Sequence, residues 1–126
     1  MAIKKWIPLA CLAVIGLVMW RTPAASQEEL DPLKVAGDTH TLLLENPIVR
    51  VISAKVPPGK IERKHKHPRG VTVYLADYEI EQTTFPSGAK NKAVRKFGTV
   101  VWSEPVVHEV KNIGKTAMHS IRIELK

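Results

Sequence analysis

The stretch Gly59-Lys-Ile-Glu-Arg-Lys-His65-Lys-His67-Pro68 places two histidines one residue apart. On an extended strand, side chains at i and i+2 lie on one face, about 7 Å apart along the backbone, so both imidazoles can reach one ion. His108 follows in a second predicted strand, in the segment that begins at Gly98. Three imidazoles from two strands can bind a divalent transition metal and leave coordination positions open for water or substrate.

Short β-strands account for nearly all of the chain around these histidines. The predicted strands cover residues 41–44, 49–56, 71–75, 78–84, 90–96, 99–103, 108–112 and 120–125. Turn residues separate them about every ten positions. The last strand alternates with period two, with apolar side chains at Ile121, Ile123 and Leu125 against Arg122 and Glu124, which is typical of a half-buried strand. The pattern predicts an all-β sandwich or barrel.

The N-terminal segment, residues 1–26, has the pattern of a signal peptide. A positive start precedes an uncharged apolar run over residues 6–20, and small side chains at Ala24 and Ser26 predict cleavage after Ser26. Cleavage places the domain in the periplasm or outside the cell, whereas an uncleaved segment anchors it to the membrane. The only cysteine, Cys11, lies in this segment, so the exported domain contains no disulfide.

The remaining chain divides into a short arm and one domain. Residues 27–38 are polar, acidic and interrupted by Pro32 and Gly37, which predicts a linker or N-terminal arm. Residues 39–126 contain the predicted strands and are short enough for a single β-barrel domain. Burial of apolar surface must stabilise this domain without disulfides, with a bound metal as additional help.

Basic side chains raise the net charge to +7 and lie in two groups. The first surrounds the histidine pair and comprises Lys55, Lys60, Arg63, Lys64, Lys66 and Arg69, and the second comprises Lys90, Lys92, Arg95 and Lys96. One interpretation is a solvated surface kept soluble by charge, and the other is a rim that attracts a small anion. Nucleic acid is not an expected partner, because aromatic residues are few and are not interleaved with the basic ones.

The histidine spacing resembles the two motifs of the cupin superfamily. Gly59, His65 and His67 match the start of the first motif, Gly followed by five residues and His-x-His, while His108 and Asn112 match the end of the second. The resemblance covers residues 39–126. It implies a small jelly-roll β-barrel, a metal held by His65, His67 and His108, and pairing of two copies into a homodimer.

Two departures from the cupin motifs affect the expected site. The glutamate of the first motif would fall near Val71 or Thr72, so three histidines remain as metal ligands. In the second motif, Glu104 and Pro105 stand in an altered turn that is one residue shorter. Three neutral imidazoles leave a divalent ion with its full charge, which favours a small anionic ligand. Similarity to cupin oxygenases with all-histidine sites makes iron the first choice of metal, with zinc, nickel, copper and manganese as alternatives.

For four other polar residues we expect a structural or an exposed role in preference to a role in the site. Asn112 is expected to shape a turn or bind backbone, and His40 and His119 lie outside both motifs, so we expect structural or exposed roles for them. Glu104 could replace the missing carboxylate ligand or simply be exposed in its turn.

Strand spacing predicts the orientation of two glutamates, and core packing predicts that of two aromatic side chains. Glu62 and Glu109 each differ by an odd number from a histidine of the same strand, so a regular pleat turns them away from the site. Tyr74 and Trp102 are expected to line or close the barrel interior.

Two functions fit this sequence. The first is an exported metal-binding protein with a three-histidine site open to a small anionic ligand, such as a metal-dependent oxygenase. The second is a non-catalytic module that binds a small molecule and retains the barrel without the chemistry. Whether the chain is an enzyme stays open at this stage, and the membrane enters only through the N-terminal segment if it is not cleaved.

Overall fold

The structure, a computed structural model, describes residues 29–126, so the predicted signal peptide and its cleavage site lie outside the described residues. The described residues form one short helix, α1 (Pro32–Val35), and two antiparallel sheets. The strands are β1 (His40–Glu45), β2 (Val49–Val56), β3 (Ile61–His67), β4 (Gly70–Tyr74), β5 (Tyr78–Phe85), β6 (Ala89–Arg95), β7 (Val100–Ser103), β8 (Val106–Asn112) and β9 (Met118–Leu125).

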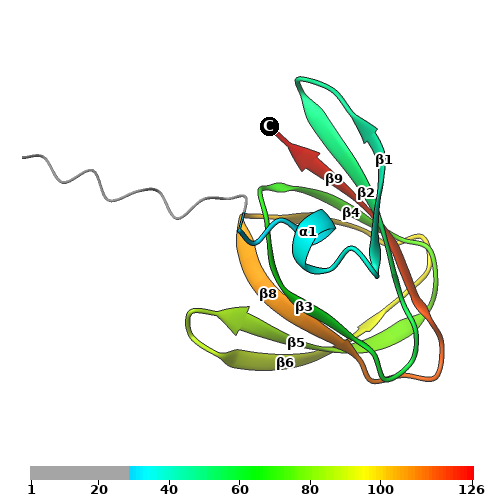
Figure 1. The fold of residues 1–126 in the computed structure, drawn as a ribbon. Coiled ribbons are helices and arrows are strands. Elements are labelled where there is room, and N and C mark those ends of the chain that lie inside the picture. Colours follow the sequence, from blue (N-terminus) through cyan, green and yellow to red (C-terminus); the bar gives the residue numbers. More distant parts are fainter. Residues whose placement is uncertain (1–28) are drawn as a thin grey trace, which may run out of the picture.

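The two sheets face each other and enclose the interior of a barrel (Figure 1). One sheet has the order β1-β2-β9-β4-β7, and the other has the order β3-β8-β5-β6. Strands far apart in the sequence are neighbours, because β2 pairs with β9 over its full length and β3 pairs with β8. This arrangement confirms the predicted all-β jelly-roll barrel, and it brings both histidine motifs into one sheet.

A β-bulge interrupts the pairing of β3 with β8. Glu62 lies opposite Val110 and His65 lies opposite His108, so β3 advances three residues while β8 advances two. The extra residue on β3 shifts the alternation of faces between Glu62 and His65. As a result, Glu62, His65 and His67 are all buried.

The inner face of β9 is polar. Along this strand the buried positions are Met118, Ser120, Arg122 and Glu124, whereas the intervening isoleucines are only half-buried. The predicted alternation is therefore present, but its charged residues point into the barrel. Such groups are costly to bury without partners, which makes their contacts informative about the site.

The segment predicted as a linker or arm includes α1 and packs against both sheets. Asp31 caps the helix by accepting a hydrogen bond from the Leu33 amide at 2.8 Å. Pro32 occupies the first turn, where the missing N–H of proline costs no intrahelical hydrogen bond. The helix contacts β1 and β3, and the Lys66 amide donates to the Leu30 carbonyl at 2.8 Å. Within residues 29–126, no helix has the length and apolar character needed to cross a membrane.

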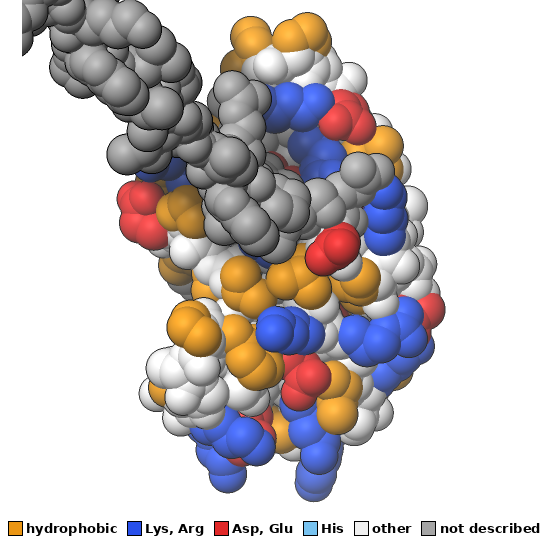
Figure 2. All heavy atoms as spheres, turned by 60° about the vertical axis from the view of Figure 1, so that its left-hand side comes forward, with side chains coloured by type: hydrophobic (Ala, Val, Ile, Leu, Met, Phe, Trp, Pro, Cys, Tyr) orange, Lys and Arg blue, Asp and Glu red, His pale blue; other side chains and the backbone are white. Residues whose placement is uncertain are grey.

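The apolar core fills only part of the barrel. Its buried members are Ala54, Val56, Tyr74, Tyr78, Ile80, Val110 and Met118. Several aliphatic side chains lie outside this core, among them the exposed Leu42, Leu43 and Leu44 of β1. Lys and Arg side chains are prominent on the face shown in Figure 2, where no histidine of the described residues is visible. Buried histidines and their hydrogen-bond partners lie in another part of the interior.

Candidate metal centre

The three histidines predicted as ligands lie together inside the barrel. Nε2 of His65 is 3.0 Å from Nε2 of His67 and 3.1 Å from Nε2 of His108. His65 and His67 come from the same face of β3, and His108 is the direct cross-strand partner of His65 on β8. The altered turn before His108 has therefore not moved it away from the pair.

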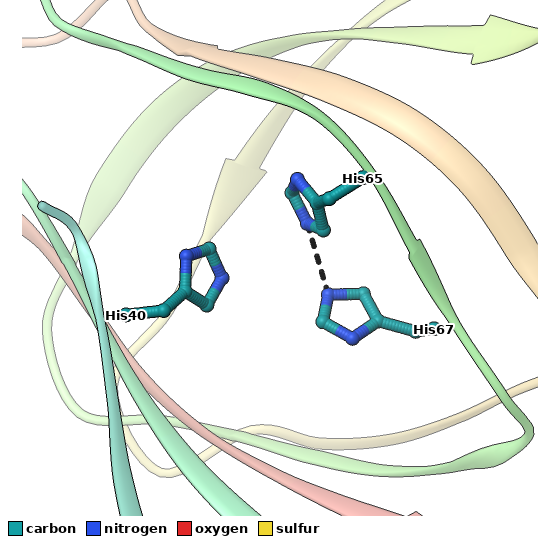
Figure 3. Close-up of side chains that lie close together, drawn as sticks. All are labelled: His40, His65 and His67. Carbon is teal, nitrogen blue, oxygen red and sulfur yellow. Dashed lines mark hydrogen bonds between the residues drawn. The ribbon is translucent and has the colours of Figure 1, made fainter. Parts of the chain in front are cut away.

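His40 is a fourth member that the sequence pattern did not assign to the site. It stands at the first position of β1, in the opposite sheet, and its ring lies 4.9 Å from the ring of His65 between centroids. Figure 3 shows His40, His65 and His67 pointing toward one another. One ligand nitrogen from each of these three buried histidines lies within 4.8 Å of the others, so the three could hold a metal ion.

Hydrogen bonds fix the tautomers of three of these histidines. Nδ1 of His65 is 2.6 Å from the Arg63 carbonyl, and Nδ1 of His67 is 2.5 Å from Oε1 of Glu124. Nδ1 of His40 is 3.2 Å from the Ala36 carbonyl. Carbonyl and carboxylate oxygens only accept, so in each case the ring donates through Nδ1. Nε2 is then left with a free lone pair, the form in which imidazole binds a metal.

Burial keeps the imidazoles neutral. Burial first, and then neighbouring rings or guanidinium groups, lower the pKa of His40 and of His65 to about 4 and that of His67 to about 3. The pKa of His108 is also well below its usual value, chiefly through burial and then through His65. All four rings are therefore available as neutral ligands at physiological pH.

The short separation between lone pairs fits a shared cation. His65 and His67 both carry their proton on Nδ1, so no hydrogen lies between their Nε2 atoms at 3.0 Å. Two lone pairs at this distance repel each other unless a positive ion lies between them. Metal to imidazole distances of about 2.0–2.1 Å place adjacent ligand nitrogens about 2.9–3.4 Å apart, which matches this spacing. The donor set therefore fits a divalent transition metal.

The prediction that Glu62 faces away from the site is wrong, because the β-bulge in β3 changes the alternation of faces. Its side chain is 2% exposed, and Oε1 lies 3.5 Å from Nε2 of His40. The same oxygen has no hydrogen-bond partner among the described residues. Burial raises the pKa of Glu62 to about 8. A buried carboxyl group therefore stands beside the histidines, at a position that the cupin motif does not assign.

Glu124 links the histidine cluster to a charged network. Oε1 of this side chain faces His67, and its Oε2 accepts from Nε of Arg50 at 2.6 Å. Arg50 in turn donates to Asp31 at 2.5 Å. A carboxylate that holds the non-ligating nitrogen of a histidine orients the ring and increases its basicity. Glu124 is placed to do this for His67.

A cavity of about 510 Å³ opens beside the cluster. Three histidines, His40, His67 and His108, reach its wall, whereas His65 is completely buried behind them. Apolar side chains such as Ile80 line another part of the wall. A small molecule in this cavity would meet imidazole nitrogens on one side and apolar surface on the other, as is usual in ligand sites.

Positive charge reaches this cavity from one arginine of the second basic group and from one arginine that the sequence analysis did not select. None of the first basic group lines it: Lys60 and Arg63 pair with Asp38 at the surface, and the Lys64 ammonium lies over the ring of Phe85. Arg95 of the second group does line it. Arg122 supplies a further guanidinium from β9.

The remaining interpretations can be compared with the structure directly. Asn112 binds backbone as expected, because its Nδ2 donates to the carbonyls of Val56 and Thr116 and its Oδ1 accepts from the Gly114 amide. Glu104 is exposed and accepts from the indole of Trp102 at 2.8 Å, at the edge of the cavity.

Tyr74 is buried and lines the cavity as expected, whereas the side chain of Trp102 is about half exposed at the same wall. His119 lies on the half-buried face of β9, away from the cluster.

Several solved structures with the same architecture are cupins. The fold and its inward histidine cluster define a double-stranded β-barrel with a candidate metal site. A cupin domain from Bordetella pertussis Tohama I superposes with a TM-score of 0.63 at 27% identity, over 69% of this chain and 91% of that one. This likeness supports the cupin superfamily as the family of this chain, whose fold is that of a cupin.

More distant structures share the fold alone. An RmlC-like cupin from Methanocaldococcus jannaschii has a TM-score of 0.55 at 16% identity, over 69% of this chain and 80% of that chain. A conserved protein with a double-stranded β-helix domain from Klebsiella pneumoniae has a TM-score of 0.54 at 17% identity, over 79% and 86%. No family model matches the sequence, and no curated protein matches it significantly.

Proposed function

We propose that this cupin binds a divalent transition metal through His65, His67 and His108 and presents it to a small anionic ligand in the adjoining cavity. The observation that carries the proposal is the convergence of three Nε2 atoms at 3.0 and 3.1 Å, with the His65 and His67 protons on Nδ1. His40 completes the cluster from the other sheet and offers a fourth nitrogen.

Charge favours an anionic ligand. The four histidines are neutral, and burial raises the pKa of Glu62 to about 8 in the metal-free chain. A divalent ion would therefore retain most of its charge, and Arg95 and Arg122 add to it at the cavity wall. An anion that reached the cavity would be attracted by both sources.

The metal decides which chemistry follows. Iron, copper or manganese would supply redox chemistry, such as oxygenation of the bound anion, whereas zinc or nickel would supply a Lewis acid. The chain's own residues bind the metal, orient His67 through Glu124 and surround the ligand with apolar side chains. If turnover is absent, the same site serves as a binding module.

The N-terminal pattern supports an exported protein. Its positive start, apolar run and small side chains at Ala24 and Ser26 are those of a cleaved leader. Expression of the full chain in a Gram-negative host, followed by N-terminal sequencing of the periplasmic fraction, should give a chain that begins at Gln27. Recovery of the uncleaved chain in the membrane fraction would instead favour an anchored protein.

The metal site is tested on untagged protein. Metal content is measured after purification, and the chelator-treated protein is titrated with Fe²⁺, Zn²⁺, Ni²⁺, Cu²⁺ and Mn²⁺. We expect one ion per chain, and loss of that ion in His65→Ala. His119→Ala is the matched control, because it removes a histidine from the half-buried face of β9. Absence of stoichiometric binding for every ion, or equal loss in both variants, would contradict the proposal.

A further inference from the structure

Arg122 is a buried cation that contacts no carboxylate among the described residues. Its side chain is 5% exposed on the inner face of β9. Its two terminal nitrogens donate to three neutral oxygens: the Thr72 hydroxyl at 3.1 Å, the Ser103 hydroxyl and the Pro68 carbonyl at 2.5 Å. Its Nε has no partner among the described residues.

Glu124, the nearest acidic residue to Arg122 along β9, already binds other side chains. Both carboxylate oxygens of Glu124 are used, one by His67 and the other by Arg50. Buried charges in proteins are normally paired, since an unpaired one costs far more than a surface charge. Arg50 lies on β2, two positions from Ile52, which is the cross-strand partner of Arg122. The charge of Arg50 is paired in the usual way, because it contacts two carboxylates. Arg122 therefore lacks an anion that Arg50 has.

Arg122 lines the same cavity as His67 and His108. The positive charge of Arg122 contributes to the lowered pKa of His67 and of His108. Thr72, Ser103 and Ser120 place hydroxyl groups on the same wall. The cavity thus carries a guanidinium with hydroxyls in addition to the histidine nitrogens.

We propose that Arg122 selects the ligand of this cavity by binding the carboxylate of a small organic acid whose other end reaches the histidine cluster. The metal at that cluster rests on the function proposed above, but the carboxylate subsite does not require it. A single guanidinium with two hydroxyls matches a monoanionic carboxylate. Phosphate would need a second cation of equal proximity, and Arg95 instead lies over the ring of Tyr74.

A purely structural role would predict different behaviour. Arg122 joins β9 to β4, to β7 and to the residue after β3 through its three hydrogen bonds. Neutral donors could make those contacts without burying a charge. If Arg122 has only a structural role, its replacement should change the stability of the fold and not ligand choice. If Arg122 binds the ligand, the protein should prefer a carboxylate to the corresponding uncharged amide. That preference is the quantity to measure.

The test compares matched probes by calorimetry on the chelator-treated protein and on the Zn²⁺-loaded protein. The probes are acetate, propionate and succinate, their amides, and inorganic phosphate. We expect the acids to bind the wild-type chain and the amides not to. Arg122→Gln should weaken acid binding about ten- to a hundredfold, as loss of a charge-assisted hydrogen bond does. Zn²⁺ affinity should stay within about twofold, and Arg69→Gln, the control at a surface arginine outside the cavity, should change acid binding by less than about threefold.

Each outcome decides one of the two proposals. Acid binding that survives Arg122→Gln, equal binding of acids and amides, or tighter binding of phosphate overturns the carboxylate subsite. Failure of Zn²⁺ and of each of the other four metal ions to bind the wild-type chain overturns the metal proposal and leaves the subsite to be decided on the chelator-treated protein. If Arg122→Gln does not fold, guanidinium ¹⁵N resonances of the wild-type chain decide: succinate should shift those of Arg122 and succinamide should not, and equal or absent shifts overturn the subsite.

Discussion

Glu124 and His67 lie on opposite sheets of the barrel, and Oε1 of Glu124 accepts a hydrogen bond from Nδ1 of His67 at 2.5 Å. This contact joins β9 to β3 across the interior. It also fixes the orientation of a candidate metal ligand, since the ring can then offer only Nε2 to an ion. Glu124, on the polar inner face of β9, is thus part of the candidate site.

Replacing Glu124 should weaken metal binding without removing any metal ligand. Glu124→Gln keeps the shape of the side chain but loses the charge that orients His67, and we expect metal affinity to fall about ten- to a hundredfold. Competition with a chelator of known affinity measures the change. Asp31→Asn is the control, because it removes the other carboxylate of Arg50 and leaves the hydrogen bond between Glu124 and His67 in place. Equal losses in both variants would assign the effect to the Arg50 network.

Glu62 should make the metal-free protein less stable as the pH rises. Its pKa is raised from 4.5 to about 8 in the folded chain, so the unfolded chain loses the proton first. Stability from this group is complete below pH 4.5 and is lost as the pH approaches 8. Between pH 6.5 and 8 the free energy of unfolding should fall by about 2 kcal/mol, at the limiting slope of one proton.

Chemical denaturation in the presence of a chelator, at several pH values, measures this slope. Glu62→Gln should abolish it, and Glu109→Gln, which changes the same charge in the same sheet, should not. A slope that persists in Glu62→Gln would place the responsible group elsewhere.

The histidines should destabilise the metal-free protein in acid. The folded pKa values of His40 and His65 are lowered from 6.5 to about 4, so the unfolded chain binds protons first as the pH falls. Their contribution is present above pH 6.5 and is lost as the pH falls toward 4. The Glu62→Gln variant removes the opposing trend and is the background for this measurement. Adding His40→Gln should reduce the acid slope, and an unchanged slope would show that His40 does not titrate.

The sequence predicted the barrel well because strand formation is a local property. Runs of branched side chains and the turns between them mark most strands to within a few residues, and β2, predicted over residues 49–56, has those bounds. The two histidine motifs also predicted His65, His67 and His108 as neighbours, and Nε2 of His65 lies 3.0 and 3.1 Å from those of the other two, whereas their role as metal ligands stays a prediction. Period-two spacing and pairing of β3 with β8 were enough to place them.

The rest of the site depends on relationships between strands that no single stretch contains. The bulge that turns Glu62 inward appears only when β3 is aligned with β8, because it is a mismatch between the two strands. His40 begins a strand in the other sheet, and nothing near it in the sequence resembles a motif. The inward face of β9 is decided by its partners, since Glu124 faces His67 and Arg122 faces Thr72 and Ser103.

Gly70 should tolerate no side chain, in contrast to a glycine required only by its backbone angle. A Cβ at Gly70 would overlap the Ile123 carbonyl of the neighbouring strand, and that backbone atom cannot move without breaking the pairing of β4 with β9. We expect Gly70→Ala to lower the free energy of unfolding by about 3 kcal/mol or more. Gly59 has a φ of 78° but open space around its Cβ position, so Gly59→Ala should cost only about 1 kcal/mol. Denaturant unfolding of the two variants measures both, and a smaller loss for Gly70→Ala than for Gly59→Ala would show that β4 and β9 are not packed as closely as described.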